Sequence, residues 1–199
     1  MVTKLTALRS NKGIKHEGPV RSLSPIKRFI RYAVAASASI LLVILGVMAY
    51  NFYTLSPQKL FTDNYRVYEF NSGRDDSTGY TKLENAYRAK DYQAVIKLST
   101  KPDSSNIKEN FLLASSYTEL KNYPRAIQNY NKVLKENERK GTLFLNDETE
   151  YYLALAYLRN RDYDLALDLM ENINNNPAHL YHSKVTSKLI RKVKMLKWR

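Results

Sequence analysis

The sequence predicts an all-α protein: a single membrane-spanning helix near the amino terminus, an array of about three helical hairpins, and a capping helix at the carboxyl end. One observation is that residues 32–57 carry no charged side chain and centre on an aliphatic run, residues 40–49. Another is that two later stretches share the pattern Tyr, Tyr six residues on, and Ala three residues beyond. Both stretches lie between apolar residues at helical spacing, which is what two helices joined by a tight turn need.

The first 29 residues form a basic tail. As far as Arg31 the chain has eight Lys or Arg and one acid, Glu17, without an apolar period. This composition is typical of a disordered segment whose charge acts as a topology signal. A nucleic-acid-binding arm is the alternative, and it is disfavoured because no aromatic interleaving or nucleic-acid-binding motif accompanies the charge.

Residues 30–52 are predicted to be a transmembrane helix. About 20 helical residues cross a hydrocarbon core of about 30 Å, and Tyr50 and Phe52 follow where an aromatic belt would meet the headgroups. Because the Lys and Arg residues precede this segment, we expect the amino end in the cytoplasm and the remaining chain on the extracytoplasmic side, which would be the periplasmic side if the membrane is a bacterial inner membrane.

A signal peptide cleaved after Ala49 is the alternative to this anchor. The basic tail is longer than a usual signal n-region, and the apolar run exceeds about 7–15 residues, so an uncleaved anchor is favoured. The small residues at 33–39 would let a second helix approach closely, which leaves a homo-oligomer open.

Residues 53–79 join the membrane helix to the hairpins. They contain an aromatic run, residues 60–70, and a polar, turn-rich linker, residues 71–79. The aromatic run is too apolar for a free linker, so it either lies along the membrane surface or packs as an extended segment against the hairpins. Packing is favoured because the run carries acids as well as bases.

Residues 80–178 hold the hairpin units. The two clear copies are 40 residues apart, and a weaker copy around Tyr92 lies 31 residues before the first of them. Small residues between the helices allow close packing. The signature positions are Leu113, Ala114, Tyr117, Tyr123, Ala126, Leu153, Ala154, Tyr157, Tyr163 and Ala166.

This pattern resembles the tetratricopeptide repeat (TPR), a helical hairpin of about 34 residues. The unequal spacings indicate a shortened turn near residues 102–104 and an insertion near residues 138–142. In the TPR family the first helix of each hairpin lines a groove that takes an extended peptide or a partner's helix. The groove-facing positions, carried over by register, are Tyr80, Glu84, Phe111, Ser115, Tyr151 and Leu155.

The resemblance implies a protein or peptide partner in this groove. Chaperone-binding members hold a terminal carboxylate with Lys or Asn at these positions, and this chain lacks them, so hydrophobic segments suit its aromatic groove better. The equally weighted alternative is that the groove is filled by aromatic residues of the same chain. These are Phe61, Tyr65, Tyr68 and Phe70.

Residues 179–199 are predicted to form a basic capping helix. Apolar residues recur at helical spacing among seven bases, and a terminal repeat needs a polar outer face. A contact with anionic lipid headgroups or an acidic partner is the alternative reading of these bases. The apolar positions are Leu180, Val185, Leu189, Val193 and Leu196.

The sequence offers little for catalysis, so we expect no enzyme, cofactor or metal site. There is no Cys, and the three His are His16, His179 and His182. The last two could share a helical face but have no acid beside them in the sequence, and surface positions are expected for both. No glycine spacing fits a phosphate-binding loop, and the acids at 147–150 precede a helix, where they favour its positive end.

The layout is similar to that of bacterial inner-membrane TPR proteins, which implies an envelope scaffold that tethers a partner or holds emerging secreted chains. A transmembrane regulatory protein whose basic tail contacts a cytoplasmic partner is the alternative. Deleting residues 1–24 would abolish such a relay and spare a scaffold. A third hypothesis, a receptor with its repeats in the cytosol, requires the opposite membrane orientation.

Overall fold

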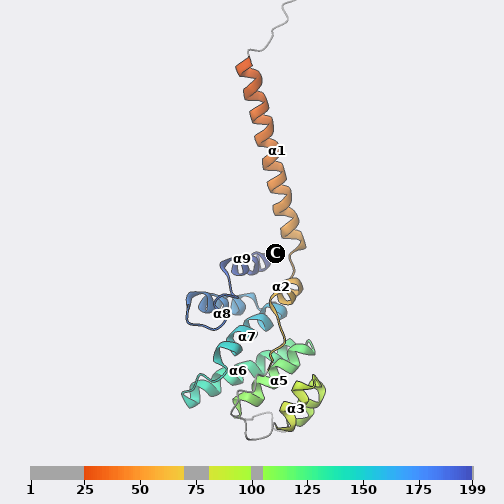
Figure 1. Ribbon diagram of the computed structural model, residues 1–199, viewed down its shortest axis with the longest axis vertical. Coiled ribbons are helices and arrows are strands. Elements are labelled where there is room, and N and C mark those ends of the chain that lie inside the picture. Colours follow the sequence, from red (N-terminus) through yellow and green to blue (C-terminus); the bar gives the residue numbers. More distant parts are fainter. Residues whose placement is uncertain (1–24, 70–80, 100–104, 199) are drawn as a thin grey trace, which may run out of the picture. The chain divides into compact units, whose positions relative to one another are not determined.

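A computed structural model describes residues 25–69, 81–99 and 105–198, and all regular structure in these ranges is helical (Figure 1). The helices are α1 (Pro25–Thr54), α2 (Pro57–Asn64), α3 (Lys82–Arg88), α4 (Tyr92–Leu98), α5 (Ile107–Glu119), α6 (Tyr123–Lys140), α7 (Asn146–Asn160), α8 (Tyr163–Asn175) and α9 (Ser187–Lys197). The chain divides into two units, Met1–Tyr50 and Asn51–Arg199. The predicted linker, residues 71–79, and most of the predicted tail lie outside the described residues.

Helix α1 is long and apolar enough to cross a membrane. Its segment Tyr32–Thr54 has 23 residues with a mean hydropathy of 2.3, and none of it is buried. At about 1.5 Å per residue this segment is about 35 Å long. The hydroxyls of Ser37 and Ser39 donate to the carbonyls of Val34 and Ala35 at 2.9 Å, so they find partners inside the helix. The helix begins before the predicted start at residue 30 and takes in part of the basic segment.

Helix α2 begins at the pair Ser56 and Pro57. The Ser56 hydroxyl accepts a hydrogen bond from the backbone N–H of Lys59 at 3.1 Å, and proline suits the first helical position. Leu60 and Phe61 are buried. The aromatic run therefore packs into the fold as predicted, but its first part is helical rather than extended, because a serine cap and a proline start a helix there.

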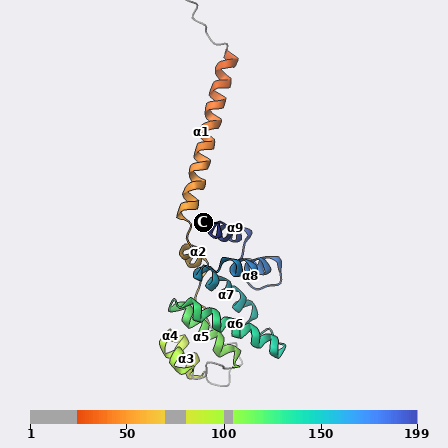
Figure 2. The same cartoon turned by 180° about the vertical axis from the view of Figure 1, so that it is seen from behind.

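Three hairpins, α3/α4, α5/α6 and α7/α8, follow one another along the second unit (Figure 2). Their turns share one conformation. A basic residue adopts a left-handed φ of 60° to 72°: Lys90, Lys121 and Arg161. The next residue donates its N–H to the carbonyl five residues back: Asp91 to Ala86 at 3.0 Å, Asn122 to Tyr117 at 2.8 Å, and Asp162 to Tyr157 at 2.9 Å. This is the Schellman hydrogen bond that ends a helix.

The hairpins differ in length. Helices α3 and α4 have seven residues each, whereas α6 has 18 and is capped by Gly141, whose φ is 63°. The predicted insertion near residues 138–142 thus coincides with the last turn of α6 and the loop after it. The predicted short turn near residues 102–104 lies outside the described residues.

The core of the second unit forms where the hairpin helices cross. The small signature residues Ala114, Ala126, Ala154 and Ala166 have no exposed surface, which lets neighbouring helices approach closely. The other signature residues are buried or half-buried against the same core: Leu113, Tyr117, Tyr123, Leu153, Tyr157 and Tyr163.

Helix α9 is shorter than the predicted capping helix of residues 179–199. It begins at Ser187, after Thr186 accepts a hydrogen bond from the N–H of Leu189 at 3.2 Å. Leu180 is exposed in the irregular segment before it, so the helical period does not extend that far back. The remaining predicted apolar positions are buried: Val185, Leu189, Val193 and Leu196.

The left-handed turn residue gives a test of the shared turn. Replacing Lys121 with Gly should raise the free energy of unfolding by about 1 kcal/mol, because an L-residue is strained at this φ and glycine is not. The same substitution at the exposed Lys135, inside α6, should lower it by about 1 kcal/mol. Urea denaturation followed by circular dichroism measures both. Equal destabilisation by the two variants would contradict the left-handed turn.

Candidate functional site

The candidate site is the face formed by the first helix of each hairpin, α3, α5 and α7. We call it the A-helix face and define it by Tyr87, Phe111, Tyr151 and Tyr152. Helix α2 and residues 65–69 pack against this face. A segment of the same chain therefore packs on the face that the TPR resemblance describes as a groove, for which the sequence left a partner and the chain's own aromatic residues as equal alternatives.

Tyrosine hydroxyls hold the backbone of this segment. Tyr151 donates to the carbonyl of Asn64 at 2.7 Å, Tyr152 to that of Arg66 at 2.9 Å, and Tyr87 to that of Tyr68 at 3.0 Å. The acceptors are two residues apart, which is the period at which an extended chain presents the same edge. Tyr65 itself has extended dihedral angles, φ −81° and ψ 135°. The A-helix face thus binds main-chain carbonyl groups, which every peptide has.

Aromatic contacts accompany these hydrogen bonds. The ring of Tyr68 packs edge-on against Phe111 with 4.8 Å between centroids, and Tyr65 packs against Tyr152 at 5.6 Å. Phe61 stacks on Tyr65 at 4.6 Å. Each such pair contributes about 0.5–1.5 kcal/mol beyond the area it buries. The side chains of the segment therefore add to what its backbone gains.

A second layer supports the face from behind. Phe111 contacts the buried ring of Tyr130 at 5.7 Å, whose hydroxyl lies 3.2 Å from the hydroxyl of Ser115. Tyr151 stacks on Tyr181 with 4.2 Å between centroids. These contacts restrict the orientations of Phe111 and of the donor ring of Tyr151.

Burial keeps the donor hydroxyls protonated. It raises the pKa of Tyr87 and Tyr152 well above the ordinary value, with neighbouring tyrosines adding to the effect. It raises the pKa of Tyr151 to about 12, although the positive charge of Arg66 works in the opposite direction. All three remain hydrogen-bond donors throughout the physiological pH range.

The structure places the predicted groove residues in two settings. Phe111, Ser115, Tyr151 and Leu155 are buried under the segment or in the layer behind it. Glu84 lies at a neighbouring pocket, and Tyr80 is outside the described residues. Of the two alternatives left open by the sequence, the filled groove is the one observed.

The sequence interpretation named Phe61, Tyr65, Tyr68 and Phe70 as the residues that would fill the groove. Tyr65 and Tyr68 contact the A-helix face, whereas Phe61 stacks on Tyr65 and packs against Tyr123 of α6. Phe70 lies outside the described residues. The interpretation missed Tyr87 and Tyr152. Tyr152 directly follows a predicted groove residue, and Tyr87 stands in the weak first copy, so neither position had an independent signal.

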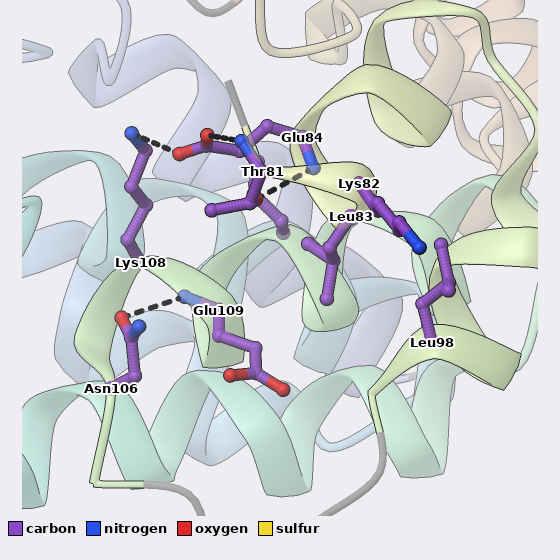
Figure 3. Close-up of a pocket in the computed structure, with 9 residues that line it drawn as sticks. Thr81, Lys82, Leu83, Glu84, Leu98, Asn106, Lys108 and Glu109 are labelled. Carbon is purple, nitrogen blue, oxygen red and sulfur yellow. Dashed lines mark hydrogen bonds and ion pairs between the residues drawn. The ribbon is translucent and has the colours of Figure 1, made fainter. Parts of the chain in front are cut away.

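A charged pocket of about 330 Å³ lies between α3 and α5 (Figure 3). Glu84 accepts a hydrogen bond from the N–H of Thr81 at 2.8 Å and forms an ion pair with Lys108. Burial opposes ionisation of Glu84, but the hydrogen bonds from Lys108 and Thr81 outweigh it, so its pKa is lowered. The second acid, Glu109, accepts from the Ser99 hydroxyl at 3.0 Å. Both carboxylates thus have structural partners, and they position the starts of α3 and α5.

His179 is buried, contrary to its predicted surface position. Its Nδ1 accepts from the N–H of Tyr181 at 3.0 Å, and its Nε2 lies 3.4 Å from Glu150 and 3.7 Å from Asp147. The turn before α9 folds this ring back onto the start of α7, a contact that the local sequence does not indicate. Among the described residues no group of three or more His, Asp or Glu is placed to hold a metal ion.

Comparison with known proteins gives one family. The model of the tetratricopeptide repeat matches residues 110–137, which run from α5 through most of α6. No curated protein and no solved structure matches the chain. The matched stretch includes five of the predicted signature residues: Leu113, Ala114, Tyr117, Tyr123 and Ala126.

Proposed function

Because the chain is a tetratricopeptide repeat protein, we propose that it is a membrane-anchored adaptor that binds an extended segment of a partner protein along its A-helix face. Helix α1 anchors it, and the repeats lie on the extracytoplasmic side of a bacterial inner membrane. Its role is binding rather than catalysis. In the absence of the partner, residues 64–68 occupy the face.

The observation that carries this proposal is the set of three tyrosine hydroxyls on alternate main-chain carbonyls. Recognition through carbonyls does not depend on the side chains of the bound peptide, so the same donors can hold a partner's segment in place of residues 64–68. Phe111 and Tyr152 then supply contacts for its aromatic or apolar side chains.

The chain's own segment competes with the partner. A short linkage gives an attached segment an effective concentration of the order of millimolar. A partner peptide therefore gains access when it binds more strongly than residues 64–68 or when that segment is loosened. This competition makes the proposal testable with a single peptide.

Membrane anchoring is supported by the length and hydropathy of Tyr32–Thr54. Lys27, Arg28 and Arg31 precede this segment, and the next charged residue is Lys59. This asymmetry favours a cytoplasmic amino end.

Protease treatment of intact spheroplasts tests the orientation. With a tag at each end of the full chain, the carboxyl-terminal tag should be lost from outside while the amino-terminal tag is protected. Lysed spheroplasts, in which both tags should be cleaved, are the control. Protection of the carboxyl-terminal tag in intact spheroplasts would instead support a receptor with its repeats in the cytosol.

Peptide exchange tests the binding face. A labelled peptide of residues 62–69 should bind the full chain with Tyr65→Ala and Tyr68→Ala more tightly than it binds the wild type, because the attached segment has lost its aromatic contacts. Adding Tyr152→Phe should weaken binding by about threefold to tenfold, the value of one hydrogen bond. Fluorescence anisotropy measures the affinities.

The matched control is Tyr157→Phe, also on α7. Its hydroxyl accepts a hydrogen bond from Asn131 rather than from the segment, so its removal should leave peptide binding unchanged. A reversed-sequence peptide controls for composition. Equal peptide affinity of the wild type and the Tyr65→Ala, Tyr68→Ala variant would contradict the proposed displacement of the chain's own segment. An affinity that does not change with Tyr152→Phe would contradict it as well. Circular dichroism verifies that each variant is folded, and Tyr68→Ala alone serves if the double variant is not.

A further inference from the structure

A basic pocket of about 290 Å³ lies between α2 and α9, within the second unit. Lys59 lines it from α2, and Lys188 and Lys192 line it from α9. Leu55 and Met195 supply apolar walls, and Asp63 is the acid in the lining. Three ammonium groups and one carboxylate leave a net positive charge.

The bases of α9 divide into two sets. Lys194 pairs with Glu171 at 2.7 Å, and Lys197 pairs with Asp164, both on α8. Lys188 and Lys192 are one helical turn apart and line the pocket beside α2. Within the described part of the chain no carboxylate forms an ion pair with either of them, so their charge is available to a ligand.

Chain length limits how far this pocket can lie from the end of α1. Thr54, the last residue of α1, itself lines the pocket, and α2 begins only three residues later, at Pro57. Three residues span at most about 10 Å. The polar interface on each side of a bilayer is about 5–7 Å thick. If α1 crosses a bilayer, the wall of the pocket that Thr54 forms is therefore at the end of the span, where the headgroups begin.

The end of α9 has the composition of a membrane interface. Trp198 is 86 % exposed and directly follows the helix, while Met195 is 37 % exposed at the pocket. Tryptophan is enriched at headgroup level because its ring is apolar and its N–H is polar. An exposed tryptophan at the end of a basic helix is suited to such a surface.

We propose that this pocket binds the phosphate of an anionic phospholipid headgroup in the bilayer that α1 crosses. The inference rests on the proposed membrane anchoring. Lys59, Lys188 and Lys192 donate to the phosphate, and the apolar walls contact the glycerol and upper acyl region. The bound lipid fixes α2 and α9 to the membrane surface and so sets the orientation of the A-helix face.

The single tryptophan of the chain, Trp198, provides the measurement. The full chain is reconstituted in vesicles of phosphatidylcholine, with or without phosphatidylglycerol, that contain a headgroup-labelled quencher lipid. Quenching of Trp198 should increase when phosphatidylglycerol is present, and salt should reduce the increase. In the double variant Lys188→Gln, Lys192→Gln, the increase in quenching with phosphatidylglycerol should be lost.

The control variant is Lys194→Gln with Lys197→Gln, which removes the same charge from the same helix but from lysines engaged by α8. It should retain most of the increase. Equal loss in both variants would show general charge attraction and overturn the pocket. Competition by millimolar inorganic phosphate would show a free-phosphate site and overturn the lipid assignment.

Carbonate extraction separates this inference from the proposed anchoring. If the wild type resists extraction but shows no response to phosphatidylglycerol, the lipid pocket is rejected and the anchor stands. If carbonate extracts the wild type, the anchor is rejected, and the lipid pocket with it.

Discussion

The backbone carbonyls of Asn64, Arg66 and Tyr68 must find hydrogen-bond donors because they face a buried aromatic surface. Three tyrosine hydroxyls meet this need. Those hydroxyls can do so only if α3 and α7 are held at the right separation, which the aromatic layer around Phe111 and α5 provides. The segment that follows α1 is therefore part of the repeat fold, because its backbone is held by side chains of α3 and α7.

Local features of the hairpins could be predicted from the sequence. The Tyr and Ala spacing marks α5/α6 and α7/α8 because it reflects contacts within one hairpin. The start of α2 could have been predicted from Ser56 and Pro57, but the sequence analysis missed it. It also missed the basic residue that precedes Asp or Asn at each of the three turns. The start of α9 was misplaced because an apolar period continued through an irregular segment.

The occupant of the groove could not be decided from the sequence. Tyr151 and Tyr152 lie 87 and 86 residues from the carbonyls they hold, so no local pattern links them. The composition of the aromatic run favoured packing against the hairpins over the membrane surface, but it did not show which face of the hairpins the run would cover. The burial of His179 could not be predicted for the same reason, because the acids near its ring, Asp147 and Glu150, are distant in the sequence and lie on α7. Helix α2 connects the two proposed sites: Lys59 lies at the basic pocket, and Asn64 begins the segment on the A-helix face.

Occupation of the A-helix face by the chain's own segment is the claim on which the proposed adaptor depends. Nuclear Overhauser spectroscopy of the full chain in micelles, with the aromatic rings isotopically labelled, tests it without any substitution. The arrangement predicts cross-peaks between the rings of Tyr68 and Phe111, whose centroids are 4.8 Å apart. Absence of these cross-peaks, together with random-coil shifts for residues 65–69, would show that the segment leaves the face empty.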